Sequence, residues 1–118
     1  MKMLPFIVQH KKQLFKWYRK HLKKVVDFIP TDLEHQTPTY PEILVSKRDN
    51  LVEELRAEGI GCRAVYDSLC NQPFHRKYRT PTPIADELAS RGLHLPGQFN
   101  LREEDVKKIA SVVKNHAA

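Results

Sequence analysis

The sequence predicts an α+β fold in which a small sheet packs against helices. Two observations favour this class: apolar residues recur with a helical period at both ends of the chain, and short apolar runs of strand length lie between them. The expected order is helix, strand, strand, helix, strand, helix, short strand, helix. The 118 residues fit a single domain, with a basic helix over residues 1–26 and a small α+β body over residues 27–118.

The first predicted helix covers residues 7–26, where lysines occupy most positions between the apolar ones. Pro5 precedes it, and the start of a helix tolerates proline. The apolar stripe consists of Ile7, Leu14, Tyr18, Leu22 and Val25, widened by Phe15 and Trp17. Residues 25–30 then predict a short strand closed by Pro30, and residues 31–41 predict a loop.

The next helix has the strongest boundary signals in the chain, and it follows a short buried strand at residues 43–45. Ser46 with Asp49 three residues later is typical of a capping box. Gly59 is typical of the residue just after a helix, where a left-handed conformation is needed. Three residues would face inward from this helix: Leu51, Val52 and Leu55.

A second strand is expected at residues 60–66, followed by a loop over residues 67–80. Thr82 with Pro83 at the first helical position begins another helix, which Gly92 ends. Its inner side would carry Ile84, Leu88 and Ala89.

The last predicted helix follows a short extended segment at residues 93–96. Asn100 with Glu103 has the spacing of a further capping box. The inner face of this helix would consist of Leu101, Val106, Ile109, Val112 and Val113. Together these elements give one layer of helices against a small sheet, with no internal repeat.

No catalytic or metal-binding constellation is predicted within the chain. The six histidines are scattered, and Cys62 and Cys70 do not have the paired spacing of zinc ligands. Gly59 and Gly61 follow a helix, whereas a phosphate-binding loop would join a strand to a helix. His75 lies five residues after Cys70, but loop neighbours seldom orient a thiol and an imidazole as a catalytic pair.

Positive charge is concentrated at the start of the chain. Residues 1–24 carry seven lysines and Arg19 with no acidic residue, while the whole chain has a net charge of +6. A nucleic-acid surface needs exposed aromatic side chains among the basic ones. Here the aromatic residues lie on or beside the apolar stripe. The pattern therefore favours a solvated helix face over a nucleic-acid site. The aromatic side chains are expected to pack in the core or to contact a protein partner.

The sequence gives no indication of a membrane partner. No apolar run approaches the ~20 residues that a membrane-spanning helix requires. The apolar stretch from Met3 to Val8 is too short for a signal-peptide core, and two cysteines suit a reducing compartment. We therefore expect a cytoplasmic protein.

A series of short sequence blocks runs in a fixed order from Arg48 to Val106. The blocks are Arg48-Asp49-x-Leu51, Leu55, Gly59-Ile60, Arg63, Tyr66, Gln72-Pro73-Phe74, Pro83 to Leu93, Leu95-Pro96 and Asn100-Leu101-x-Glu103-Glu104-Asp105-Val106. In this order they resemble the C-terminal small domain of the DegT/DnrJ/EryC1/StrS family of PLP-dependent sugar aminotransferases, most closely the perosamine synthase and spore-coat polysaccharide types. The basic helix, with Trp17-Tyr18, is similar to the helix that links the two domains there.

The resemblance implies a place for this chain in such enzymes. The fold would be that of the small domain of fold-type I aminotransferases, which closes over the cofactor cleft. Arg63, Tyr66 and Gln72 would bind the sugar-nucleotide substrate, with Arg63 facing anionic groups. Cys70 departs from the family, where a histidine is common at that position. The lysine, acidic residue and phosphate cup that bind PLP belong to the large domain, so the resemblance implies no cofactor-binding or catalytic residue here.

Two hypotheses of function follow. The first is a truncated or split sugar-nucleotide aminotransferase of polysaccharide or cell-surface sugar biosynthesis, which would not transaminate without a large-domain chain. The second is a non-catalytic protein-binding or assembly module derived from that domain, which would form a homo-oligomer or bind another protein through the face that packs on the large domain.

Overall fold

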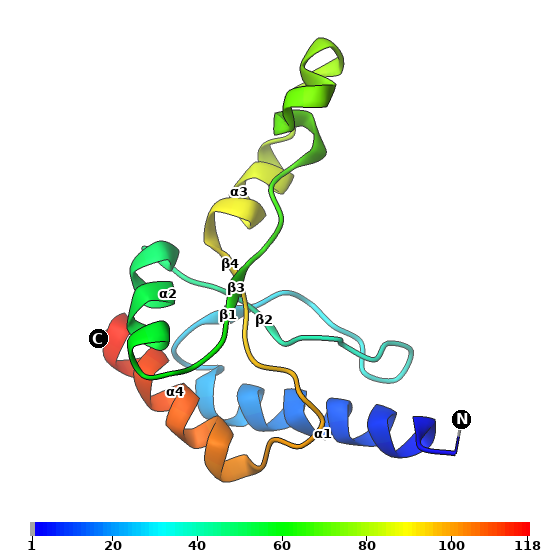
Figure 1. Cartoon of the computed structure of the whole chain (residues 1–118), viewed down its shortest axis with the longest axis vertical. Helices are drawn as coiled ribbons and strands as arrows, with labels where there is room; N and C mark the ends of the chain where they lie inside the picture. The colour runs from blue at the N-terminus through cyan, green and yellow to red at the C-terminus, as the bar shows by residue number, and fades with distance from the viewer. Residues whose placement is uncertain (1) are drawn as a thin grey trace.

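The computed structural model describes residues 2–118 and has a sheet of short strands beside a layer of helices (Figure 1). The elements in chain order are α1 (Leu4–Leu22), β1 (Asp27–Phe28), β2 (Glu42–Leu44), α2 (Arg48–Ala57), β3 (Arg63–Ala64), the 3₁₀ helices η1 (Leu69–Asn71) and η2 (Pro73–Tyr78), α3 (Pro83–Arg91), β4 (Gly92–His94) and α4 (Glu103–Ala117). The predicted α+β class and the predicted order of helices and strands are confirmed.

The sheet is antiparallel throughout, with the strand order β1-β2-β4-β3. The short segment after Gly92 is thus an inner strand, paired on both sides. Residues that face each other across antiparallel strands project from the same side of the sheet. Ile43, Leu93 and Ala64 form one such row, and the first two are fully buried. This row defines the apolar face of the sheet.

Helices α1, α2 and α4 cover the apolar face, and α4 packs against both of the others. One buried cluster joins the three helices to the sheet. Its members are Leu14, Tyr18, Leu22, Ile43, Val45, Leu51, Val52, Leu55, Leu93, Leu95, Val106, Ile109, Ala110 and Val113. The predicted inner faces of the first, second and last helices are therefore confirmed for most of their residues.

Helix α1 begins at Leu4 with Pro5 in its first turn, and it ends at Leu22, so both predicted boundaries are shifted. Val25 and Val26 lie in the turn that follows. The Tyr18 hydroxyl donates to the Pro96 carbonyl at 3.0 Å, and burial raises the pKa of this phenol. No helix within residues 2–118 has the length and apolar character to cross a membrane.

The basic face of α1 is partly paired with α4. Lys20 Nζ lies 2.8 Å and His21 Nε2 lies 3.0 Å from the same carboxylate oxygen of Glu103. Hydrogen bonds from these two side chains lower the pKa of Glu103. These two contacts link the two longest helices at the surface, so this part of the basic face has a structural role.

The start of α2 differs from the prediction. Lys47 is the N-cap residue, in a left-handed conformation with φ of 51°, and no side chain caps the helix. Asp49 does not form the predicted capping box with Ser46, because its carboxylate accepts a hydrogen bond from Arg48 Nε at 2.6 Å.

The end of α2 is as predicted. Gly59 has φ of +72°, and its N–H donates to the Arg56 carbonyl. The N–H of Ile60 donates to the Leu55 carbonyl at 2.9 Å, which completes a Schellman motif.

Helix α4 begins two residues later than predicted. Arg102 is the N-cap, and the Asp105 carboxylate accepts a hydrogen bond from its N–H at 2.9 Å. The predicted box of Asn100 and Glu103 is therefore wrong. Glu103 is instead occupied by the side chains of α1.

Residues 67–91 form an arm that extends away from the rest of the molecule (Figure 1). The predicted loop at 67–80 contains η1 and η2, and the predicted strand at 60–66 is reduced to Arg63–Ala64. Only Ala89 of α3 is buried, and Ile84, expected to face inward, is 75% exposed. Within residues 2–118 no second layer covers the arm, so most of its apolar side chains are exposed.

His116 near the end of α4 connects three elements. Its Nδ1 lies 3.0 Å from Glu54 Oε1 on α2, and its Nε2 lies 3.0 Å from the Ser46 carbonyl. Both partners are acceptors, so only the protonated ring can donate to both. The hydrogen bond to Ser46, opposed by desolvation and aided by Glu54, raises the pKa of His116.

We expect the His116 contacts to stabilise the fold more at low pH than at high pH. A histidine whose pKa is raised by folding stabilises the folded state fully below the unfolded pKa of about 6.5, and this contribution is lost as the pH rises through the folded value. The melting temperature of His116→Gln should therefore fall further below that of the parent chain at about pH 5.5 than at about pH 8.5. His75→Gln, at an exposed position on η2, is the control. An equal difference at both pH values would contradict the assignment.

Candidate functional site

The candidate site is on the sheet face opposite to the apolar row. The strand register pairs Glu42 with His94 and Arg63 with His94, so the three side chains form a row across β2, β4 and β3. They alternate with the apolar row of Ile43, Leu93 and Ala64, as the period of two residues requires. A carboxylate, an imidazole and a guanidinium thus lie side by side on a face that no helix of the layer covers.

A hollow of about 280 Å³ lies over this row. It is lined by Tyr40, Gly61, Cys62, Arg63, Tyr66, His94, Leu95, Pro96, Gly97 and Gln98. A second hollow of about 710 Å³ adjoins it and shares Tyr40, Tyr66 and His94, with Glu42 and the loop from Ile29 to Thr39 completing its wall. The two hollows adjoin at Tyr40, Tyr66 and His94, which line both of them.

Two tyrosine rings flank His94. The ring centroid of Tyr40 lies 5.6 Å from that of His94, and the ring centroid of Tyr66 lies 5.9 Å from it. The Tyr66 hydroxyl accepts a hydrogen bond from Arg63 Nη1 at 3.3 Å. His94 itself has a side chain only 11% exposed, and its Nδ1 is 3.3 Å from Glu42 Oε1.

Close backbone packing positions Tyr40. A Cβ at Gly97 would lie 2.6 Å from the Thr39 carbonyl oxygen and 3.1 Å from the Tyr40 ring, so only glycine allows this approach. Lys11 strengthens the contact: its ammonium group donates to the Thr39 carbonyl at 2.8 Å and to the Gly97 carbonyl at 2.9 Å, and it lies 5.6 Å from the Tyr40 ring centroid. The rim on this side is therefore held in place.

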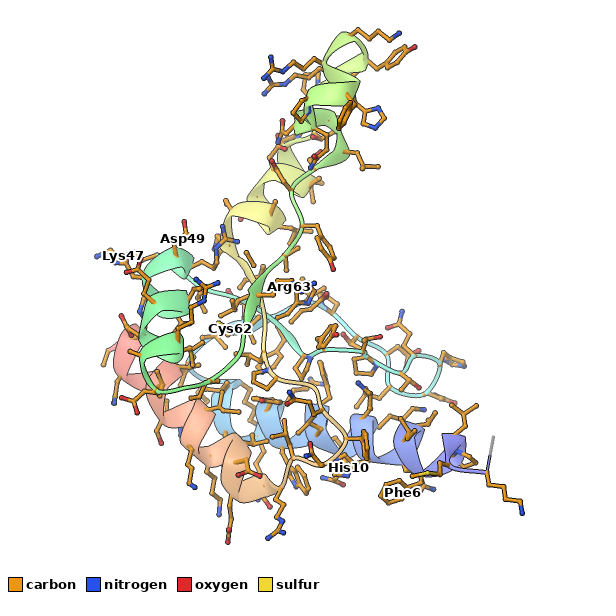
Figure 2. The ribbon with its side chains drawn as sticks, viewed as in Figure 1. Phe6, His10, Lys47, Asp49, Cys62 and Arg63 are labelled. Carbon is orange, nitrogen blue, oxygen red and sulfur yellow. The ribbon has the colours of Figure 1, made fainter. Side chains whose placement is uncertain are left out.

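The structure brings together two of the three predicted substrate-binding residues. Arg63 lies at the base of the arm, on β3, and it contacts Tyr66 (Figure 2). Gln72 lies on the arm between η1 and η2 and does not line either hollow. Its predicted role stays a prediction.

Three residues of the site were missed by sequence reasoning, namely Tyr40, Glu42 and His94. The available signal was the alternation of polar and apolar residues along two short strands, Glu42-Ile43 and Leu93-His94. His94 was considered only as a possible metal ligand, and its strand neighbours were not predictable from local sequence.

The site has the groups for binding an anionic polyol but not for holding PLP. Arg63 is exposed and can bind an anion, while Glu42 and His94 can exchange hydrogen bonds with hydroxyl groups. PLP in an aminotransferase requires a lysine for the Schiff base. No lysine lines the hollows, and Lys11 at the rim is bound to two backbone carbonyls.

Other reactive groups lie away from this site. Asp32, Glu34 and His35 are close enough to share a metal ion, but all three are exposed, and Asp32 already accepts hydrogen bonds from the other two. Burial raises the pKa of Cys62. Hydrogen bonds from Thr80 lower the pKa of Cys70, whose partners in the described chain do not include His75.

Comparison with known proteins gives a consistent result. The profile of the DegT/DnrJ/EryC1/StrS aminotransferase family matches residues 1–114. A UDP-N-acetyl-3-dehydro-alpha-D-glucosamine 3-aminotransferase from Acidithiobacillus ferrooxidans is 32% identical over an alignment of 110 residues, covering 83% of this chain and 28% of that protein.

Solved structures agree with the match. A DegT/DnrJ/EryC1/StrS aminotransferase from Brucella abortus has a TM-score of 0.89 and 26% identity, covering 99% of this chain and 33% of that one. The sugar aminotransferase Spr1654 from Streptococcus pneumoniae, solved in its PMP form, has a TM-score of 0.87 and 17% identity, with 98% and 32% covered. The chain thus spans about a third of the length of these relatives.

Proposed function

Because the chain belongs to the DegT/DnrJ/EryC1/StrS aminotransferase family, we propose that it is the small domain of a sugar-nucleotide aminotransferase and that its polar sheet face binds the substrate. The observation that carries the proposal is the row of Glu42, His94 and Arg63, whose members line the two adjoining hollows beside Tyr40 and Tyr66. A sugar nucleotide offers a diphosphate and several hydroxyl groups, and this row offers partners for both.

Arg63 is the residue assigned to the diphosphate. Its guanidinium is exposed, and its one hydrogen bond to a side chain within residues 2–118 goes to the neutral phenol of Tyr66. It is therefore free to form charge-assisted hydrogen bonds with a phosphate. The name of the Acidithiobacillus relative, a UDP-linked amino sugar enzyme, supports a nucleotide diphosphate as the ligand class.

Amino transfer requires more than this chain provides. The relatives are about three times as long, and the groups that hold PLP would come from the part of an aminotransferase that lies outside these 118 residues. We propose that this part occupies the open corner between the arm and the loop of residues 29–41, which lies between the arm and α1 (Figure 1). The amino acceptor would then be a sugar nucleotide of polysaccharide or cell-surface sugar biosynthesis.

Exposed apolar side chains on the arm support this placement. They are Leu69, Phe74, Tyr78 and Ile84. Met3, Leu4 and Phe6 at the start of α1 are exposed too, but Phe6 points away from the arm (Figure 2). Phe74 is 89% exposed, more than any other large apolar residue among those described. Such side chains are costly to leave in water when they form a patch, and a large domain would bury them.

The same apolar residues favour a second candidate function, a non-catalytic assembly module. In that case the arm would bind another copy or another protein, and the polar sheet face would have no ligand. Binding of a sugar nucleotide at Arg63 separates the two functions, because an assembly module has no need of it.

We expect the chain to bind UDP-N-acetylglucosamine weakly, with Arg63 in the site. Loss of a charged hydrogen-bond donor is worth about 1.5–3 kcal/mol, so Arg63→Gln should reduce the affinity by about tenfold or more. Two-dimensional amide NMR of the labelled chain, titrated with the sugar nucleotide, measures this. Signals from β3, β4 and Tyr66 should move in the parent chain.

Arg76→Gln provides the matched control, since it removes the same charge from an exposed position on η2. It should leave the affinity within about twofold of the parent value. If Arg63→Gln and Arg76→Gln bind equally well, or if no signal near β3 moves at any ligand concentration, the proposed function is wrong for this face.

A further inference from the structure

His94 is an unusual residue for the middle of a sheet. Neither of its ring nitrogens has a hydrogen-bond partner among residues 2–118, and both are buried from water. Glu42 Oε1 lies 3.3 Å from Nδ1, but the geometry is not that of a hydrogen bond. Buried polar groups in native proteins are almost always paired. At least one nitrogen of this imidazole therefore needs a partner that residues 2–118 do not provide, namely a ligand or a water molecule.

The neighbours of His94 define which nitrogen needs the partner. Glu42 is its cross-strand pair on β2, and its carboxylate favours a proton on Nδ1. A small rotation of either side chain would complete that hydrogen bond. Nε2 then carries the free lone pair and acts as an acceptor. The missing partner is therefore a hydrogen-bond donor that approaches Nε2.

The two flanking rings differ in how firmly they are held. Tyr40 is held by the tight contact at Gly97 and by the Lys11 ammonium group. Tyr66 is 71% exposed, and its hydroxyl makes one hydrogen bond, to Arg63. Rotation of Tyr66 away from the sheet would uncover the imidazole while Tyr40 stays in place. The hollow would then be open to a ligand on the side where Arg63 lies.

We infer that His94 Nε2 accepts a hydrogen bond from a hydroxyl group of the sugar moiety of a sugar nucleotide, and that Tyr66 moves aside to admit it. This inference rests on the proposed function, and it identifies the residue that recognises the sugar. A sugar hydroxyl is the donor that fits, because Arg63 next to His94 already provides the site for the diphosphate. The flanking tyrosine faces also suit the apolar C–H surface of a sugar ring. His94 therefore distinguishes a sugar nucleotide from a bare nucleotide.

The test follows the ring nitrogens of His94 directly. The chain, with isotope-labelled histidine and arginine side chains, is titrated with UDP-N-acetylglucosamine and, separately, with UDP. We expect the sugar nucleotide to shift His94 Nε2 and the Arg63 side chain, while UDP shifts Arg63 alone. His75, which is exposed on η2, should not respond to either ligand.

Two variants measure the energetic contribution. A neutral hydrogen bond is worth about 0.5–1.5 kcal/mol, so His94→Ala and His94→Ser should lower the affinity for UDP-N-acetylglucosamine by about twofold to thirteenfold and leave that for UDP unchanged. The serine variant keeps a small polar group at the position. The methyl signals of Ile43 and Leu93, on the opposite face of the same strands, verify that each variant is folded.

The outcomes separate this inference from the function on which it rests. If the sugar nucleotide shifts Arg63 but leaves both His94 nitrogens unchanged, the proposed function stands and the role of His94 is wrong, with a buried water as its partner. If UDP, which lacks the sugar, also shifts the signals of His94, the residue contacts the nucleotide and the inference is overturned. If neither residue responds to either ligand, both proposals fail for this chain.

Discussion

Replacing Leu93 with alanine is expected to destabilise the chain by about 2–5 kcal/mol, the range for a buried leucine whose loss leaves a cavity. Leu93 is fully buried at the centre of the inner strand β4, and it faces Ile43 on one side and Ala64 on the other. Short strands have few hydrogen bonds, so the sheet depends on this apolar row for its attachment to the helices. Urea unfolding followed by circular dichroism measures the change.

Leu69→Ala is the matched control, because the same side chain on η1 is 73% exposed. It should change the free energy of unfolding by no more than about 0.5 kcal/mol. A large loss at Leu69 would mean that the arm packs on the body in solution, and it would contradict the placement of the remaining part of an aminotransferase in that corner.

The fold class and the helix faces were predictable because they depend on local periodicity. Leu14 and Tyr18 follow the helical period of the first helix, and Val106 follows that of the last one. The structure buries all three. Gly59 was predictable for a similar reason, since a left-handed residue at the end of a helix is a local requirement.

The capping boxes were not predictable, because long-range contacts decide them. Arg48 Nη1 donates to the carbonyls of Ala89 at 2.7 Å and Gly92 at 3.0 Å. This fixes the guanidinium at the start of α2, where its Nε binds Asp49. The Asp49 carboxylate, which the sequence predicts to cap α2, is therefore bound by Arg48, and Arg48 is itself held by the backbone of α3 and β4.

The same limit applies to the candidate site. Arg63 and Tyr66 were identified from a family resemblance, and they are close in sequence. The rest of the row depends on the register of β2 with β4, which is set by the core and by chain segments far apart in sequence. His94 therefore becomes a candidate only when its unpaired nitrogens and its neighbours are seen together.

Gly92 is expected to be the position where the smallest change has a large effect on the site. A Cβ there would lie 2.5 Å from the Leu88 carbonyl oxygen and 2.6 Å from Val65 Cγ2. The backbone oxygen cannot move without unwinding the last turn of α3. Gly92→Ala should therefore destabilise the chain by about 1–3 kcal/mol or more, as overpacking does in a core. Thermal and urea unfolding measure the loss.

Gly92→Ala should also move the arm. The Gly92 carbonyl accepts hydrogen bonds from Val65 N–H and from Arg48 Nη1, both at 3.0 Å, so it joins β3, α2 and the end of α3. Displacing it would shift Tyr66 relative to His94 and weaken sugar-nucleotide binding in the variant fraction that remains folded.

Gly61→Ala is the control for Gly92→Ala, since a Cβ at Gly61 meets nothing within 4 Å and its φ is not in the left-handed range. It should be neutral or stabilise the chain by up to about 1 kcal/mol, because alanine restricts the unfolded state. If Gly92→Ala were equally harmless, the contact of β3 with the end of α3 would be looser than the structure has it. The arm would then be free to move as a unit, and the orientation of Arg63 and Tyr66 over His94 would have to be fixed by the ligand or by the large domain proposed above.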